Sequence, residues 1–114
     1  MIIDFNDIKE TVIKNFHGGD KEARAKMFSD ENGKIMYGTL IPGASIGVHC
    51  HETNSEIVYV IQGEGKVLYD GVWEKVSAGT CHYCPKGHTH NFVNDGEEDL
   101  IIFSVVPEYL QAEQ

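Results

Sequence analysis

The chain has 114 residues, of which 41% are hydrophobic and 24% are charged, a composition typical of one soluble globular domain. Its 18 acidic residues outnumber the 9 basic ones and give a formal charge of -9, which argues against nucleic acid, since such a partner is held by clustered Lys and Arg. The N-terminal residues resemble no signal peptide, and no apolar run is long enough to span a membrane. Three cysteines, an odd number, do not suit a secreted disulfide framework. We therefore expect a cytoplasmic protein with no membrane partner.

The first part of the chain, residues 1–33, is expected to form a short N-terminal arm. Apolar residues at positions 8, 12 and 13 give residues 7–14 a weak helical spacing, and Gly18-Gly19 would end such a helix. Residues 21–28 alternate between apolar and polar side chains instead, which predicts an added strand.

From residue 34 on, glycines and turn residues divide the chain into short segments rich in Val, Ile, Tyr and Phe. Strands are predicted at 34–40, 45–51, 56–62, 65–69, 72–76, 80–84, 89–93 and 99–105. Two turn sequences, Asp70-Gly71 and Asn94-Asp95-Gly96, lie between apolar runs and predict hairpins with positive φ. This rhythm predicts an all-β domain over residues 34–107, followed by a C-terminal tail at 108–114.

Histidines and a carboxylate recur at spacings that suit a divalent-metal site. His49 and His51 are two residues apart, so on a strand both side chains leave the same face, with Cα atoms roughly 6.6 Å apart. Glu56 begins the next predicted strand and would point inward with Val58 and Val60. An unpaired carboxylate against that apolar wall would be costly, and a coordinated cation would remove the cost.

A His-x-His pair alone is more often two solvent-facing polar residues than a metal site. Here the pair belongs to two longer patterns, Gly43-x5-His49-x-His51-x4-Glu56-x6-Gly63 and Gly79-x5-Pro85-x-Gly87-x2-His90-x3-Asn94. The glycines and prolines stand at fixed offsets from the proposed ligands, and agreement at all these positions is improbable by chance.

These two segments resemble the two motifs of the cupin superfamily, with every motif position present and 15 residues between the motifs, as in small single-domain microbial cupins. The resemblance implies a double-stranded β-helix, or jelly-roll, cupin barrel. It also implies one divalent transition metal ion (Fe, Mn, Ni, Zn or Cu) held by His49, His51, Glu56 and His90. Asn94 is expected to shape the turn after the last ligand strand rather than touch the ion.

Besides a metal-free cupin scaffold, the resemblance leaves two classes of metal-binding function open. One is a metal-dependent enzyme acting on a small organic molecule, by oxygenase, isomerase, decarboxylase or lyase chemistry, among which the fold alone does not choose. The other is a non-catalytic small-molecule binding or sensing module with a structural metal. Small cupins commonly pair through sheet edges, so a homodimer is expected in either case.

Several cysteines, histidines and one aromatic residue outside the four proposed ligands are also considered for a functional role. Cys81 and Cys84 form a CxxC pattern, but on a strand they would point to opposite faces, so both are interpreted as buried packing thiols. His88 would either line the mouth of the pocket or face solvent, His17 is expected to be exposed, and His82 has no assigned role. Phe92 is the aromatic residue expected at the pocket, because it shares the face of His90.

Overall fold

Ten β-strands in two antiparallel sheets make up most of residues 1–108, the part of the chain that this computed structural model describes. The strands are β1 (Thr11–Lys14), β2 (Glu22–Asp30), β3 (Gly33–Leu40), β4 (Ser45–Cys50), β5 (Glu56–Gln62), β6 (Glu64–Tyr69), β7 (Val72–Ser77), β8 (Cys81–Cys84), β9 (Thr89–Val93) and β10 (Leu100–Pro107). Within this range the helical elements are two single 3-10 turns, η1 (Phe5–Asp7) and η2 (Phe16–Gly18). The prediction of an all-β, two-sheet barrel is confirmed.

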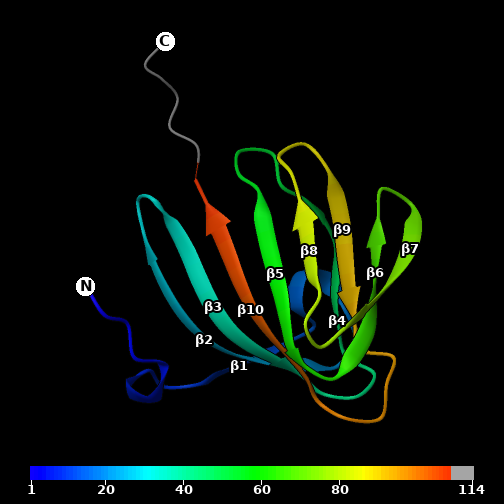
Figure 1. Ribbon diagram of the computed structural model, residues 1–114, viewed down its shortest axis with the longest axis horizontal. Helices are drawn as coiled ribbons and strands as arrows, with labels where there is room; N and C mark the ends of the chain where they lie inside the picture. Colours follow the sequence, from blue (N-terminus) through cyan, green and yellow to red (C-terminus); the bar gives the residue numbers. More distant parts are fainter. Residues whose placement is uncertain (109–114) are drawn as a thin grey trace.

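The two sheets face each other and enclose the core between them (Figure 1). One sheet has the order β1-β2-β3-β10-β5-β8, and the other has the order β4-β9-β6-β7. Because β3 and β5 lie in one sheet while β4 lies in the other, the chain crosses between the sheets both before and after β4. The strands that carry the proposed ligands therefore meet across the interior.

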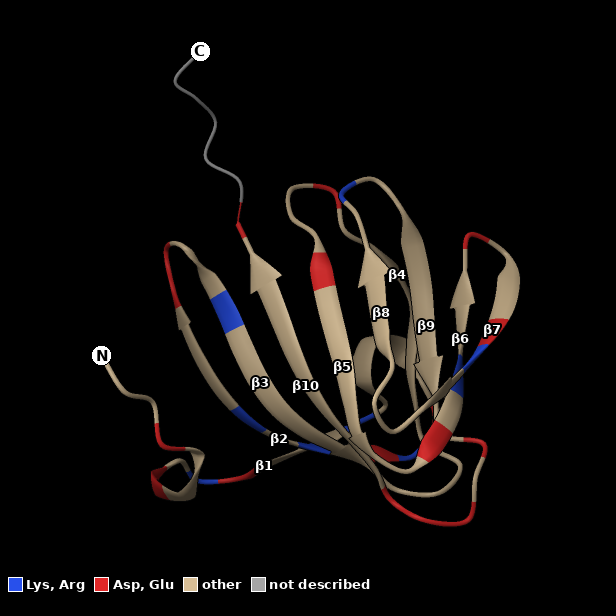
Figure 2. Ribbon diagram, viewed as in Figure 1, with Lys and Arg blue, Asp and Glu red and all other residues tan. Residues whose placement is uncertain are grey.

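The core is made by alternate residues of the strands, as the period of two requires. On β5, Val58 and Val60 are fully buried while Tyr59 between them is 45% exposed, which confirms the predicted inward face of this strand. The largest fully buried side chains, which come from both sheets, are Phe92, Leu40, Leu100 and Ile102. Figure 2 shows acidic residues in many of the loops around this core.

One of the two predicted hairpins is present. Asp70 and Gly71, with φ of 47° and 83°, form the tight turn between the paired strands β6 and β7. The hairpin predicted at Asn94–Gly96 is wrong, because β9 and β10 lie in different sheets. Asn94 is instead fully buried and bonds the Leu40 carbonyl, the Glu98 carbonyl and the Gly96 N–H, so it shapes this crossing as expected.

The N-terminal residues differ from the prediction in one respect. No helix forms over residues 7–14: η1 ends at Asp7, and residues 11–14 form β1, consistent with the β-branched run Thr11-Val12-Ile13. The added strand is confirmed, since β2 pairs with β3 from Ala23↔Leu40 to Asp30↔Gly33. Of the predicted tail, residues 109–114 lie outside the described residues. Among residues 1–108, no helical segment has the length and apolar character needed to cross a bilayer.

Candidate metal centre

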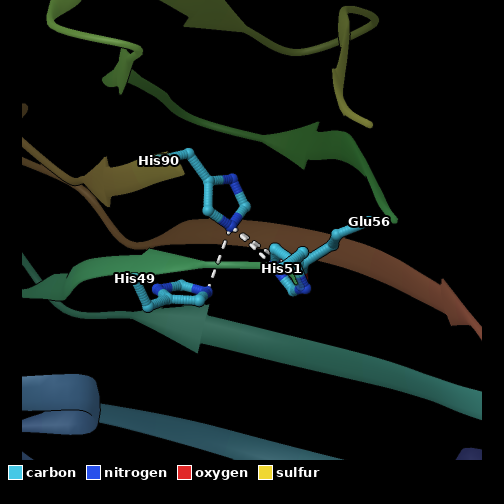
Figure 3. A group of neighbouring side chains, drawn as sticks. All are labelled: His49, His51, Glu56 and His90. Carbon is cyan, nitrogen blue, oxygen red and sulfur yellow. Dashed lines mark hydrogen bonds and ion pairs between the residues drawn. The ribbon is translucent and has the colours of Figure 1, made fainter. Parts of the chain in front are cut away.

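The four side chains expected to hold a metal converge between the sheets (Figure 3). His49 lies on β4 and pairs with His90 on β9. His51 follows the last residue of β4, and Glu56 is the first residue of β5. Residues from both motifs thus reach one point, which is the arrangement that the sequence predicted.

The donor atoms of this cluster are close to one another. His90 Nε2 lies 3.1 Å from His49 Nε2, 3.0 Å from His51 Nε2 and 3.0 Å from Glu56 Oε1. His51 Nε2 lies 2.9 Å from the same carboxylate oxygen. Neighbouring ligands of a six-coordinate ion with bonds of about 2.1 Å are about 3.0 Å apart, so these separations fit one shared ion.

Each of the three imidazoles is held through its other ring nitrogen. His49 Nδ1 lies 2.8 Å from the Gly47 carbonyl oxygen, and His51 Nδ1 lies 2.6 Å from Asn54 Oδ1. His90 Nδ1 lies 3.0 Å from His82 Nε2. An N–H at Nδ1 that donates to these acceptors leaves the lone pair of Nε2 free for a metal. A cation at the point that these lone pairs and the carboxylate share would satisfy all four donors, so the residues fit a divalent ion; without it, Nε2 protons of His51 and His90 bond Glu56.

The acceptor on Asn54 is fixed in turn by the end of β10. Asn54 Nδ2 donates to Glu108 Oε2 over 2.8 Å, and the backbones of the two residues form a β-bridge. Since the amide nitrogen is engaged by a carboxylate, Oδ1 is the atom left to accept from His51. Hydrogen bonds from Asn54 and Thr53 hold the pKa of Glu108 below its ordinary value.

Glu56 has hydrogen-bond partners, so the cost of burying an unpaired carboxylate beside its apolar neighbours does not arise. Its Oε2 accepts a short hydrogen bond from the hydroxyl of Ser104, which is buried on β10, while Oε1 faces His51 and His90. Burial alone would raise the pKa of Glu56, but these three hydrogen bonds outweigh it and hold that pKa well below its usual range. The carboxylate is therefore ionised and oriented before any ion arrives.

The histidines differ in their protonation. The hydrogen bond to Glu56 raises the pKa of His51 above its ordinary value of 6.5. Burial lowers the pKa of His49 and that of His82 to about 4, so both rings are neutral at neutral pH. A neutral His82 can accept the Nδ1 proton of His90, which is the role that the sequence had left unassigned.

A cavity of about 500 Å³ opens beside the cluster and is lined by all four proposed ligands. Of the described residues that line it, Lys34 is the only Lys or Arg, and Glu52 is the one carboxylate besides Glu56. It lies on the inward face of β3, two residues before the buried Met36, and pairs across the sheet with Val106. Within residues 1–108 its ammonium group has no carboxylate partner, although the chain is strongly acidic. The cavity therefore offers one free cation in addition to the metal donors.

The N-terminal segment supplies another wall of this cavity, which the sequence did not predict. Phe16 and His17 line it, and the His17 ring stacks on His49 with 4.2 Å between ring centroids. Although His17 is exposed as expected, it is part of the site. The stack requires Gly47, because a Cβ there would lie 2.0 Å from the His17 carbonyl oxygen.

The predictions for the cysteines, His88 and Phe92 are confirmed in part. Cys84 is buried but Cys81 is exposed, so the opposite parity is confirmed while the interpretation of Cys81 as a buried thiol is wrong. His88 is partly exposed, bonds Asp70 Oδ2 over 2.5 Å and does not line the cavity, which favours its solvent-facing reading. Phe92 lines the cavity as predicted. Cys84 also lies near His82 and His90, and these three form a second group of donors that shares His90 with the first.

Comparison with known proteins agrees with this geometry. A model of the cupin domain family matches residues 36–106. The chain belongs to the cupin family. This cupin is 31% identical over 112 residues to the protein named "Oxalate-binding protein" of Thermotoga maritima, with 93% of each chain covered.

Solved structures share its fold. A predicted oxalate decarboxylase from Thermotoga maritima superposes with a TM-score of 0.90 at 27% identity, covering 96% of this chain and 100% of that one. A RmlC-like cupin from Shewanella frigidimarina gives a TM-score of 0.78 at 19% identity, covering 96% of this chain and 92% of that one. These barrels confirm the jelly-roll architecture predicted from the motifs.

Proposed function

We propose that this cupin binds one divalent transition metal ion through His49, His51, Glu56 and His90 and uses it to bind a small organic anion. The observation that carries this proposal is the set of three Nε2 atoms and one carboxylate oxygen, 2.9–3.1 Å between neighbours, at the wall of a cavity. A mixed shell of imidazole and carboxylate suits Mn, Fe, Ni, Cu or Zn better than Ca²⁺ or Mg²⁺, which prefer oxygen alone.

The anionic character of the ligand follows from charge. Among the described residues, Lys34 brings the only Lys or Arg charge to the cavity wall, and together with a bound divalent ion it would outweigh the carboxylates of Glu52 and Glu56, which also line the cavity. Four protein donors leave about two positions of a six-coordinate ion for a ligand, which suits a chelating carboxylate. The name of the Thermotoga maritima relative makes oxalate the first ligand to test.

Elemental analysis of the purified protein tests the metal site. We expect stoichiometric transition metal in the wild type and strong loss of metal in His90→Ala or His51→Ala. His88→Ala is the matched control, because His88 lies outside the cavity lining and should leave the metal content unchanged. Equal metal loading in all these variants would refute the ligand assignment.

Calorimetric titration with oxalate tests the ligand. The metal-loaded protein should bind oxalate and the metal-free protein should not. Lys34→Met removes the cation and nearly conserves side-chain length, so it should weaken oxalate binding about 10-fold while metal content stays the same. Oxalate binding that is equal with and without metal would overturn this part of the proposal.

Metal-dependent catalysis is the second candidate function, favoured by the open cavity beside the cluster. A bound ion there would polarise a substrate oxygen as a Lewis acid. Release of carbon dioxide and formate from oxalate by the metal-loaded protein would establish turnover. Saturating binding without product would identify a binding module instead.

A further inference from the structure

The cavity has an apolar side that the metal and a small dianion would leave unused. Met36 on β3 and Ile102 on β10 come from one sheet, while Ile46 on β4 and Phe92 on β9 come from the other. All four are at most 7% exposed, and they line the same space as the metal donors. Both sheets thus contribute apolar surface beside the polar cluster.

Polar and apolar lining residues follow one another along the same strands. On β9, Phe92 shares the face of His90 and lies one step further along the strand. On β3, Met36 stands in the same relation to Lys34. His90 and Lys34 therefore each have an apolar neighbour on the same face of the strand, two residues away.

The volume is larger than a purely polar ligand requires. A cavity of about 500 Å³ falls in the range of sites that bury drug-sized ligands, whose walls are mostly apolar. Oxalate consists of two carboxylates and nothing else, so it would leave the apolar wall in contact with water. Covering that wall with an apolar group is favourable in proportion to the area removed from water.

We propose, building on the proposed metal and anion site, that this cavity takes a 2-oxo carboxylate with an apolar substituent. Such a molecule keeps the two adjacent oxygens through which oxalate would chelate a metal. Its carboxylate lies toward Lys34, and its substituent packs against Met36, Phe92 and the other apolar residues of the wall. Lys34 and the metal select the head group, and the apolar wall selects the substituent.

A homologous series of ligands tests this directly. The metal-loaded wild-type protein is titrated by calorimetry with pyruvate, 2-oxobutyrate, 2-oxovalerate and 2-oxohexanoate. We expect the affinity to rise about 4-fold with each added methylene, as burial of apolar area predicts. An affinity that stays flat or falls along the series would overturn the proposal. Comparison is made within the series, because oxalate carries one more charge than these ligands.

Two variants locate the effect on the wall. Val106→Thr and Met36→Gln each place a polar group on the cavity lining at nearly constant volume. We expect the gain per methylene to shrink in both variants, while oxalate affinity changes less than about 2-fold. An undiminished gain would mean that the substituent lies elsewhere. The wild-type series alone still decides the ligand class if either variant fails to fold.

The same titrations separate this inference from the function on which it rests. Metal-dependent binding of oxalate with no gain along the 2-oxo series would refute only the apolar subsite. Absence of binding for oxalate and for every 2-oxo carboxylate would refute the anion site as well. Metal content, measured independently, reports on the four ligands in both cases.

Discussion

The carboxylate of Glu108 accepts a hydrogen bond of 2.8 Å from the side-chain amide of Asn54, which ties the end of β10 to the residues just before β5. Asn54 in turn accepts from the His51 ring. Glu108 does not line the cavity, yet through this contact it determines which atom of Asn54 faces a proposed metal ligand.

Replacing Glu108 by Ala should therefore weaken metal binding without removing a ligand. The Asn54 amide would be free to rotate, and the His51 ring would lose its fixed acceptor. Loss of an outer hydrogen-bond partner typically costs 10- to 100-fold in metal affinity, and for this more remote contact we expect about 3- to 10-fold. Competition with a chelator of known affinity measures the change.

The matched control for this change is Glu97→Ala, which removes an exposed carboxylate from the loop before β10. It should leave metal affinity unchanged, because it alters the net charge equally but does not line the cavity. Equal losses in the two variants would show that the effect is only one of total charge.

Ser104 should matter most when no metal is bound. Its hydroxyl donates to Glu56, so Ser104→Ala leaves a largely buried carboxylate oxygen without that partner. We expect the free energy of unfolding of the metal-free protein to fall by about 1–3 kcal/mol. Urea denaturation measures it, with the exposed Ser29→Ala as control, expected within about 0.5 kcal/mol of wild type. An unchanged midpoint in Ser104→Ala would contradict the role of this hydrogen bond.

His82 should make the metal-free protein less stable in acid. Burial holds its pKa at about 4 in the folded state, below the ordinary 6.5, so the unfolded chain binds more protons between these values. The free energy of unfolding therefore decreases as pH falls from about 6.5 toward 4. In His82→Phe this decrease should be smaller by about 1–2 kcal/mol over that window.

The comparison isolates His82 because His49, whose pKa is also lowered to about 4 by burial, is present in both proteins. Denaturation curves recorded every half pH unit give the two slopes. Parallel curves for wild type and His82→Phe would show that His82 does not contribute to the acid sensitivity.

A second copy of the chain is the predicted partner of the outer face of β5 and β8. Ile57, Tyr59 and Ile61 on β5 and Tyr83 on β8 are 37–55% exposed, and β8 is an edge strand of its sheet. Light scattering should give about twice the mass of the 12.7 kDa chain. Tyr59→Lys should shift the mass to that of the monomer, because it places an unpaired charge in the interface.

The control for the dimer is Val72→Lys, at an exposed position on β7 of the other sheet, which should remain dimeric. A wild-type protein that stays at 12.7 kDa over the concentration range would contradict the prediction.

Much of the barrel could be predicted because its signals are local. Alternation identified the inward face of β5, and Asp70-Gly71 marked the β6–β7 hairpin. Asn94-Asp95-Gly96 carried the same kind of signal, but the chain there crosses between sheets, since local turn chemistry does not say which strand comes next in space. The prediction that Cys81 is buried was wrong for a related reason. Alternation along a strand shows that Cys81 and Cys84 point to opposite faces of the sheet, but it does not show which face is buried.

The proposed ligands were predicted from their spacing, whereas the residues that orient them were not. Ser104 lies 48 residues from Glu56, and Glu108 lies 54 residues from Asn54. Such contacts depend on the register of β10 against the rest of its sheet, and no local pattern encodes them. His17 was missed because its ring reaches His49 only through a left-handed backbone at φ 50°.

The stack of His17 on His49 divides the site between two parts of the chain. The four proposed donors lie between residues 49 and 90, while one wall of the cavity comes from residues 16 and 17. Substitution at Phe16 can therefore reshape the space available to a ligand while every donor atom stays in place. Ligand selectivity and ion binding are in this way determined by different segments of the chain. A library randomised at position 16 is a direct route to cupins with the same ion and new ligands.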